Sequence, residues 1–334
     1  MKLGMDHIGQ ITDEKLKFLQ QMGVEGIMAN LEGRADDAGY HSFPRLMNLK
    51  TRVAAYGMEL AAIGGNTPWS WHYKWMLGLP GRDEQIENLQ RTIRNMGAAG
   101  IPIYTYNIHA LRYYRTSSYA PVRGGALSTS FDADLVRNAP LFASGGANTE
   151  LIPEEHRRPI SDEEMWDNLR YFLNAVMPVA EEAGVTMAMH PDDPQVPQIG
   201  GVARIMRSPE AFRKLIEMFP SENNKLLFCV GCFTEMGADV PAEIRYFGER
   251  DKLAWVHFRN IKGTTEKFVE TFPDEGDADM VAVMKAFRDA GYRGHFAPDH
   301  HIRVEGDSDW GHRYWAYGLG FIRGMLLSVK SQGS

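Results

Sequence analysis

Short apolar runs alternate along the chain with longer stretches in which apolar residues recur at helical spacing. Short apolar runs bounded by turn residues indicate buried strands, and the amphipathic stretches between them indicate crossover helices of a parallel sheet. The eight runs that we interpret as strands span residues 2–5, 25–29, 58–63, 101–107, 185–190, 226–230, 253–258 and 295–299. Eight such units predict an α/β fold, a single (β/α)8 TIM-barrel domain over residues 1–334, with its active site at the C-terminal ends of the strands.

The boundaries of the expected helices carry recognisable residues. Thr12, Ser161 and Ser208 each stand just before an amphipathic stretch, and acidic residues or proline follow them in the first turn. This order is typical of capped helix starts. Glycines stand where a helix would end and the next strand would begin, at Gly23, Gly57, Gly100 and Gly184. An open doubly wound sheet is the alternative fold, but no predicted strand is followed by a Gly-x-Gly-x-x-Gly turn.

Two connections are longer than a β/α unit needs. Residues 110–160 follow the fourth strand, show weak periodicity and form a long insertion of a kind that is usually functional. We expect this insertion to be a lid over the site or a contact between the subunits of a homo-oligomer. A second elaboration, residues 260–276, follows the seventh strand and carries mixed charge.

The last four predicted strands each end in a side chain that can bind a metal ion. These residues are His190, Cys229, His257 and Asp299. The strand ends of a TIM barrel meet at one rim, so we expect the two imidazoles, the thiol and the carboxylate to converge. Each residue alone has an ordinary explanation, such as a packed histidine or a small buried cysteine. Four such coincidences on consecutive strands favour a divalent metal site.

The residue types leave the identity of the ion open. A thiolate with two imidazoles suits Zn²⁺, Fe²⁺ or Co²⁺, and a carboxylate with open water positions also admits Mn²⁺. The rim of a barrel favours open, substrate-binding coordination over a closed structural zinc site. Cys229 and Cys232 are the only cysteines, and a disulfide between them would remove the thiolate that the metal site needs.

Other polar side chains near the predicted strand ends suit a sugar acid. Arg259 stands two residues after His257, hence on the same face of the strand, and its planar guanidinium fits a carboxylate. His300 follows Asp299 directly and can act as a general acid or base near neutral pH. Further candidates for lining a sugar pocket are Asn107, Trp71, His72 and Asp192, although an aromatic cluster is equally typical of a packed loop.

Charge and composition exclude several partners. The net charge is −7 with a sequence pI of about 5.9, so no overall basic field is available to hold nucleic acid or an anionic membrane. No apolar run approaches the length of a membrane span, and the N-terminus has no apolar signal core. We therefore expect a cytoplasmic protein that acts on a small molecule.

Taken in order, several short motifs resemble the mannonate dehydratase family of uronate degradation. They are His190-Pro191-Asp192-Asp193-Pro194, Cys229-Val230-Gly231, His257-Phe258-Arg259, Gly276-Asp277-Ala278-Asp279-Met280, Pro298-Asp299-His300 and the closing Arg323-Gly324. The resemblance extends in weaker form from the first strand to the final helix. The ordered set is specific, although no single motif is.

The resemblance implies a TIM barrel related to xylose isomerase and a bound divalent ion, usually manganese or ferrous iron. It implies a hydro-lyase that converts D-mannonate to 2-keto-3-deoxy-D-gluconate and water. Carried over by motif, the four strand-end residues would be the metal ligands, His300 a catalytic acid or base, and Arg259 the residue that holds the substrate. Mn²⁺ is the ion that we expect first.

The chain departs from the family pattern in its last third. Phe272-Pro273-Asp274 stands where His commonly follows the Phe, and Ala297 stands where Arg is common. The resemblance also implies a catalytic tyrosine near the start of the last helix. Counting back from the closing Arg-Gly leads to about Trp310, and Tyr314 and Tyr317 follow it; we take Tyr314 as the candidate.

These departures keep other activities open. A dehydratase or lyase of another uronate-derived acid is one alternative, and a metal-dependent isomerase or epimerase on the same barrel is another. A barrel that binds a sugar without turnover belongs to a third class. The negative net charge and the thiol ligand disfavour a DNA-repair phosphodiesterase, a class of enzyme that also has this barrel fold.

Overall fold

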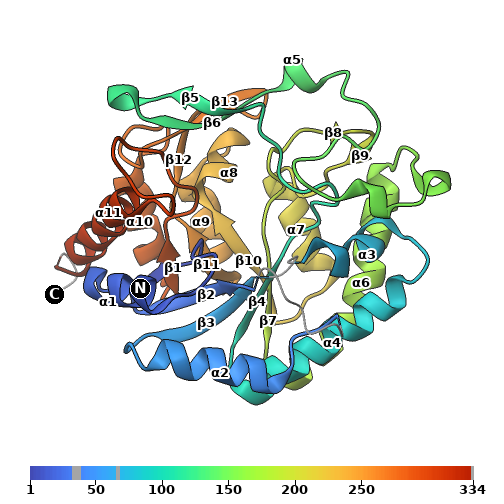
Figure 1. Ribbon diagram of the computed structural model, residues 1–334, viewed down its shortest axis with the longest axis horizontal. Coiled ribbons are helices and arrows are strands. Elements are labelled where there is room, and N and C mark those ends of the chain that lie inside the picture. Colours follow the sequence, from blue (N-terminus) through green and yellow to red (C-terminus); the bar gives the residue numbers. More distant parts are fainter. Residues whose placement is uncertain (32–38, 65–67, 332–334) are drawn as a thin grey trace.

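Eight parallel strands close into a barrel in the computed structural model, which describes residues 1–31, 39–64 and 68–331 (Figure 1). In order around the barrel, the strands are β1 (Lys2–Met5), β2 (Gly26–Asn30), β3 (Glu59–Gly64), β4 (Ile103–Tyr106), β7 (Thr186–Met189), β10 (Asn224–Cys229), β11 (Leu253–His257) and β14 (His295–Ala297). Parallel pairing of β14 with β1 completes the ring. The predicted TIM barrel is confirmed, and every predicted strand boundary lies within about two residues of the observed one, as is usual for such assignments.

Helices surround the barrel and connect its strands (Figure 1). They are α1 (Asp13–Met22), α2 (Phe43–Ala54), α3 (Tyr73–Leu77), α4 (Arg82–Ala99), α6 (Asp162–Ala183), α7 (Pro209–Met218), α8 (Val230–Glu235), α9 (Val240–Gly248), α10 (Met280–Asp289) and α11 (His312–Ser331). Within the described ranges, no helix has the length and apolar character to cross a membrane.

Local sequence sets several helix boundaries. Ser161 and Glu164 form a reciprocal capping box at the start of α6, and the Ser208 side chain accepts from the backbone N–H of Ala211 at the start of α7. Gly184 ends α6 in the left-handed conformation, as predicted. The expectation for Gly57 was wrong by two residues, because α2 already ends at Ala54 and Gly57 forms the left-handed turn beyond it.

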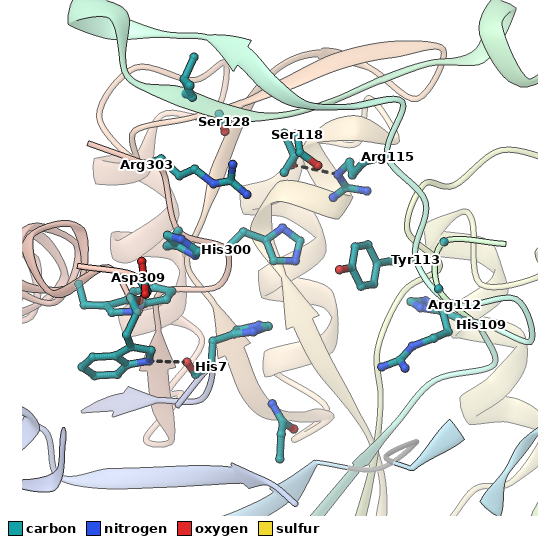
Figure 2. Close-up of a pocket in the computed structure, with 18 of the residues that line it drawn as sticks. His7, His109, Arg112, Tyr113, Arg115, Ser118, Ser128, His300, Arg303 and Asp309 are labelled. Atoms are coloured by element: carbon teal, nitrogen blue, oxygen red, sulfur yellow. Dashed lines mark hydrogen bonds between the residues drawn. The ribbon is translucent and has the colours of Figure 1, made fainter. Parts of the chain in front are cut away.

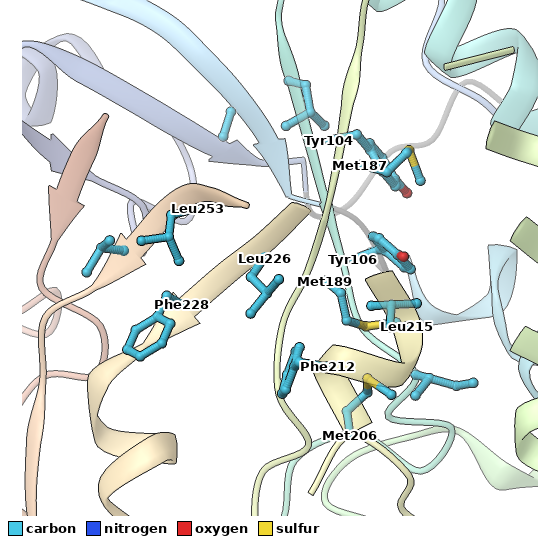
Figure 3. Packing of buried hydrophobic residues seen from close by; sticks show 14 of the residues in the cluster. Tyr104, Tyr106, Met187, Met189, Met206, Phe212, Leu215, Leu226, Phe228 and Leu253 are labelled. Carbon is cyan, nitrogen blue, oxygen red and sulfur yellow. The ribbon is translucent and has the colours of Figure 1, made fainter. Parts of the chain in front are cut away.

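Strand periodicity decides which side chains enter the barrel. Met187, Met189, Leu226 and Phe228 point outward into the large apolar core between the barrel and its helices (Figure 3). The residues between them alternate to the opposite face, where Ala188 and Leu227 join Trp255 of β11 and Ala297 of β14 in the small apolar cluster of the barrel interior. Continuing that alternation by one step turns the residues at the strand ends inward, above this cluster.

The two elaborations pair with each other. Residues 110–160, expected as a long loop, contain β5 (Ser117–Pro121), β6 (Leu127–Asp132) and the short helix α5 (Ala133–Val136). β6 pairs antiparallel with β13 (Lys267–Thr271), which pairs with β12 (Asn260–Thr264), so the sheet order is β12-β13-β6-β5. This sheet lies across the top of the barrel in Figure 1. Whether the insertion acts as a lid or as a subunit contact stays a prediction.

Helix α4 approaches α6 so closely that a side chain at one position would collide with backbone. A Cβ added at Gly97 would lie 2.5 Å from the carbonyl oxygen of Ala183 and 2.9 Å from its Cβ. We expect Gly97→Ala to destabilise the protein by about 1–2 kcal/mol, because overpacking outweighs the gain in helix propensity. Urea denaturation would measure the change.

Gly320 is the matched control, since it is an exposed glycine inside α11 and no atom lies within 4 Å of the position that an added Cβ would take. Gly320→Ala should raise stability by up to about 1 kcal/mol through helix propensity alone. Equal effects of the two substitutions would contradict the proposed collision.

Candidate active site

The four strand-end residues converge at the C-terminal mouth of the barrel. One ligand atom each from His190, Cys229, His257 and Asp299 lies within 4.8 Å of the others. Cys229 and His257 are direct partners in the register of β10 and β11, and Asp299 follows β14, the next strand of the barrel. The Cys229 Sγ lies 3.8 Å from Asp299 Oδ2, and the His257 Nδ1 lies 3.4 Å from the same oxygen. Within the described part of the chain both cysteines are free thiols.

Neighbouring acceptors orient the two imidazoles. His190 Nδ1 lies 2.7 Å from the carbonyl oxygen of Pro191, so this nitrogen carries the proton and Nε2 keeps its lone pair. His257 Nε2 lies 2.6 Å from Asp6 Oδ2, which leaves Nδ1 directed toward Asp299. Such contacts on the second ring nitrogen are typical of histidines that bind metals.

The ionisation of the cluster also fits a cation. Burial opposes ionisation of Cys229, but contacts with Cys232 and the positive charge of Arg259 outweigh it and hold the pKa of the Cys229 thiol well below its usual value. Burial likewise opposes ionisation of Asp299, yet His257 and His300 hold its pKa well below the usual range. A buried thiolate and carboxylate beside two oriented imidazoles form a donor set that fits a divalent metal ion.

Arg259 lies beside Asp299, just beyond the end of β11, and is fully engaged by protein acceptors. Its Nε donates to Asp299 Oδ2 at 2.9 Å, one terminal nitrogen donates to Glu235 at 2.8 Å, and the other contacts Asp193 and Cys232 at 3.3 and 3.2 Å. The side chain is buried. These contacts place Arg259 against the ligand Asp299 and away from the cavity surface.

The position of the Arg259 side chain depends on the absence of a side chain at Gly231, the glycine of the Cys-Val-Gly motif. A Cβ added at Gly231 would lie 2.7 Å from Cζ and 2.9 Å from Cγ of Arg259. Because those atoms are held by the contacts of the guanidinium, they have no room to withdraw. Gly231 therefore leaves the space that Arg259 occupies.

His300 stands between the four-residue cluster and the open space above it. Its Nδ1 lies 2.7 Å from Glu270 Oε1, and its Nε2 lies 3.7 Å from Asp299 Oδ1. Burial lowers the pKa of His300, but the carboxylates of Asp299 and Glu270 outweigh it and raise that pKa to about 9. The His7 Nε2 lies 2.9 Å from Asp299 Oδ1, so His7 faces the same carboxylate from β1.

Two connected cavities lie at this mouth. The smaller has a volume of about 150 Å³ and is lined by three of the four cluster residues, His190, His257 and Asp299. The larger has a volume of about 730 Å³ (Figure 2). Residues shared by both walls are His7, Asn30, Asn107, His109, Tyr113 and His300. A substrate can therefore reach from the cluster into the larger space.

The larger cavity is cationic although the protein as a whole is acidic. Arg112, Arg115 and Arg303 line it, against the single carboxylate of Asp309 among the described lining residues. Arg115 is paired with buried acids, whereas no hydrogen bond or ion pair from another described residue engages the guanidinium of Arg112 or Arg303. Figure 2 shows both of these arginines at the wall of the pocket. Such a wall suits an anionic ligand.

The other residues singled out from the sequence are distributed differently. Asn107 lines both cavities. Asp192 is buried, where it accepts from the backbone N–H of Met206, and its neighbour Asp193 lines the smaller cavity. Trp71 and His72 are not among the described residues that line either cavity; Trp69, two residues earlier, lines the larger one.

Tyr314 is buried in the first turn of α11. Burial raises the pKa of its phenol, and the charges of Glu270 and Asp299 raise it further. Tyr314 is not among the described residues that line either cavity. Tyr317 instead donates to Asp274 at 2.6 Å on the outer surface. Of the two tyrosines, Tyr314 is therefore the buried one.

Sequence reasoning missed several residues of this mouth. Asp6 and His7 follow β1 directly, so the strand-end rule that identified the four cluster residues would also have found them. Arg115 and Glu270 carry no comparable signal, because they come from the two elaborations and meet only through sheet pairing.

Comparisons with known proteins match this chain to mannonate dehydratases over nearly its whole length. The family model described as D-mannonate dehydratase (UxuA) matches residues 1–333. A mannonate dehydratase of Streptococcus pneumoniae (strain 70585) is 36% identical over 277 residues, which cover 78% of this chain and 75% of that protein. Mannonate dehydratase 2 of Halalkalibacterium halodurans is 31% identical over 350 residues and covers 99% of this chain and 100% of its own.

A solved structure of a mannonate dehydratase also matches this chain closely. The crystal structure of mannonate dehydratase from Streptococcus suis serotype 2 matches with a TM-score of 0.86 and 31% identity, covering 100% of this chain and 95% of that one. The apo form of 3-keto-D-glucoside 4-epimerase, YcjR, from E. coli matches with a TM-score of 0.62 and 14% identity over 97% and 99% of the chains, a likeness of fold alone. With the family model matched from end to end, this chain belongs to the D-mannonate dehydratase family.

Proposed function

We propose that this protein converts D-mannonate to 2-keto-3-deoxy-D-gluconate and water with the help of a divalent metal ion. The observation that carries the proposal is the cluster of His190, Cys229, His257 and Asp299, which opens beside His300 into a cationic cavity. Family membership supports the choice of substrate. The charge of the cavity supports a sugar acid over a neutral sugar.

The four cluster residues would hold the ion. We propose Mn²⁺, with Fe²⁺, Co²⁺ and Zn²⁺ as alternatives that the mixed donor set also accepts. When bound, the ion supplies positive charge beside the carboxylate of the substrate, where negative charge increases as the C2 proton leaves.

The protein must also move protons. The reaction breaks the C2–H bond and the C3–O bond, and the C3 hydroxyl leaves as water after it gains a proton; the resulting enol becomes the 2-keto acid. His300 is our first candidate for an acid or base, because Nδ1 is engaged by Glu270 and the ring lines both cavities. Tyr314, a buried phenol whose pKa is raised by burial and by the charges of Glu270 and Asp299, is the second candidate.

The contacts of Arg259 differ from those of the two cavity arginines, Arg112 and Arg303, and indicate different roles. Each guanidinium nitrogen of Arg259 already contacts a protein acceptor, so we propose that Arg259 holds Asp299 in place. Arg112 and Arg303 line the larger cavity and are our candidates for binding the carboxylate or hydroxyl groups of the substrate.

The activity is tested directly with a panel of aldonates. We expect purified protein loaded with Mn²⁺ to form a 2-keto-3-deoxy acid from D-mannonate, detected by its periodate–thiobarbiturate colour. An epimerase or isomerase would instead give isomeric sugars without loss of water. Absence of the keto-deoxy product from every aldonate tested would overturn the dehydratase assignment.

Substrate binding is tested at the cavity wall. We expect Arg303→Gln and Arg112→Gln to raise the KM for D-mannonate by about 10- to 100-fold, the equivalent of a lost hydrogen bond to a charged group. Steady-state kinetics would measure the change. Arg137→Gln is the matched control, since it removes the same charge from the exposed residue that follows α5 in the same insertion. An unchanged KM in both cavity variants would show that the substrate is held elsewhere.

Metal binding is tested with two neighbouring thiols. We expect Cys229→Ser to lose most of its bound metal, measured by atomic emission on the dialysed protein, because the thiolate is one of four donors. Cys232→Ser should retain the metal, since its sulfur lies outside the four-residue cluster and accepts from Arg259. Equal metal content in both variants and in the unmodified protein would contradict the assigned site.

A further inference from the structure

We propose that Glu270 is a positioning residue for His300, and that Arg115 at the base of the inserted hairpin holds Glu270 in place for this role. The inference rests on the proposed function for its catalytic meaning. It assigns to the two elaborations of the barrel a direct part in the site.

The first step of the argument is the contact between Glu270 and His300. Glu270 Oε1 lies 2.7 Å from His300 Nδ1, and the carboxylate is buried with about 5% of its surface exposed. A carboxylate oxygen accepts, so Nδ1 of the imidazole carries the proton. The ring is thereby fixed with its other nitrogen, Nε2, on the side of Asp299 and the cavities.

The second step is the hydrogen-bonded ion pair between Arg115 and Glu270. The Arg115 Nε and one terminal nitrogen donate to Glu270 Oε1 at 3.2 and 2.5 Å. The two terminal nitrogens also donate to the two oxygens of Asp193, in a bidentate pair at 2.5 and 2.7 Å. The guanidinium lies 5.0 Å from the ring centre of Phe268 on β13. Arg115 is thus fixed on both sides, and an anchored guanidinium in turn fixes the carboxylate.

The third step is the origin of these residues. Arg115 stands just before β5, and Glu270 lies on β13, so the two come from separate elaborations of the barrel. Pairing of Val269 with Ser130 and of Phe268 with Phe131 joins β13 to the inserted hairpin next to this contact. Figure 2 shows Arg115 and His300 among the side chains around the pocket. Without the paired sheet, neither Glu270 nor Arg115 would lie above His300.

The chemical consequence concerns which nitrogen meets the substrate. A histidine that exchanges protons with a substrate needs one ring nitrogen directed at it, and a partner on the other nitrogen sets that direction. The contact of Glu270 with Nδ1 leaves Nε2 as the nitrogen on the side of the cavities. Loss of Glu270 would let the ring rotate or adopt the other tautomer, so the chemical step would slow while substrate and metal still bind.

The kinetic test compares two carboxylates of one hairpin. We expect Glu270→Gln and Glu270→Ala to lower kcat for D-mannonate by about 10²- to 10⁴-fold, the usual range for a lost acid–base contribution. The KM and the bound Mn²⁺ should stay within about threefold of the unmodified enzyme. Glu266→Gln, on the exposed turn of the same hairpin, should leave kcat unchanged. A kcat within twofold in both Glu270 variants, or a loss of kcat only in proportion to lost metal, would overturn the proposal.

A spectroscopic test uses the unmodified protein and needs no turnover. In ¹⁵N-histidine-labelled protein loaded with diamagnetic Zn²⁺, we expect the His300 signal, assigned by its absence in His300→Asn, to show a protonated Nδ1. An unprotonated Nδ1 in the folded protein would refute the positioning contact. Because this readout does not depend on the substrate, failure of the proposed function and failure of this inference are distinguishable.

Discussion

The site depends on the pairing of buried charges at the mouth of the barrel. The two carboxylate oxygens of Asp299 have different partners. Oδ2 contacts Arg259 and His257. Oδ1 contacts His7 and faces His300. Ionised groups withdrawn from water are tolerated only when they are paired, and loss of one partner of such a pair costs about 3–5 kcal/mol. The interactions that prepare the site for a cation are therefore also part of what keeps this rim folded.

A second set of charges connects that rim to the sheet above it. Asp193 bridges the two guanidinium groups of Arg115 and Arg259, and Glu270 joins the first of these to His300. The barrel supplies the cluster residues together with His7, Asp193 and Arg259, while the two elaborations supply Arg115 and Glu270. This division explains how one common fold acquires a particular chemistry from its connections.

Sequence reasoning succeeded where a local rule applied. The period of two along each strand determines that His190 and Cys229 point inward, and strand ends of a parallel barrel share one rim, so convergence followed from position alone. It failed where elements distant in sequence had to meet, because no periodicity encodes the pairing of residues 260–271 with residues 117–132. The sequence also predicted Arg259 as a substrate-binding residue from its type and spacing, but sequence alone did not indicate that Arg259 is buried against Asp299 and Glu235.

The narrow fit between Gly231 and Arg259 has a consequence for how such a chain can change. The Arg259 side chain occupies the space that a side chain at position 231 would need, although Gly231 in α8 and Arg259 after β11 lie in separate motifs. A residue larger than glycine could be accommodated only together with a shorter side chain at position 259, which would release Asp299 from its partner. A larger residue at position 231 alone is therefore blocked by sterics, a shorter residue at position 259 alone loses the contact with Asp299, and a redesign of this barrel has to treat the two positions as one unit.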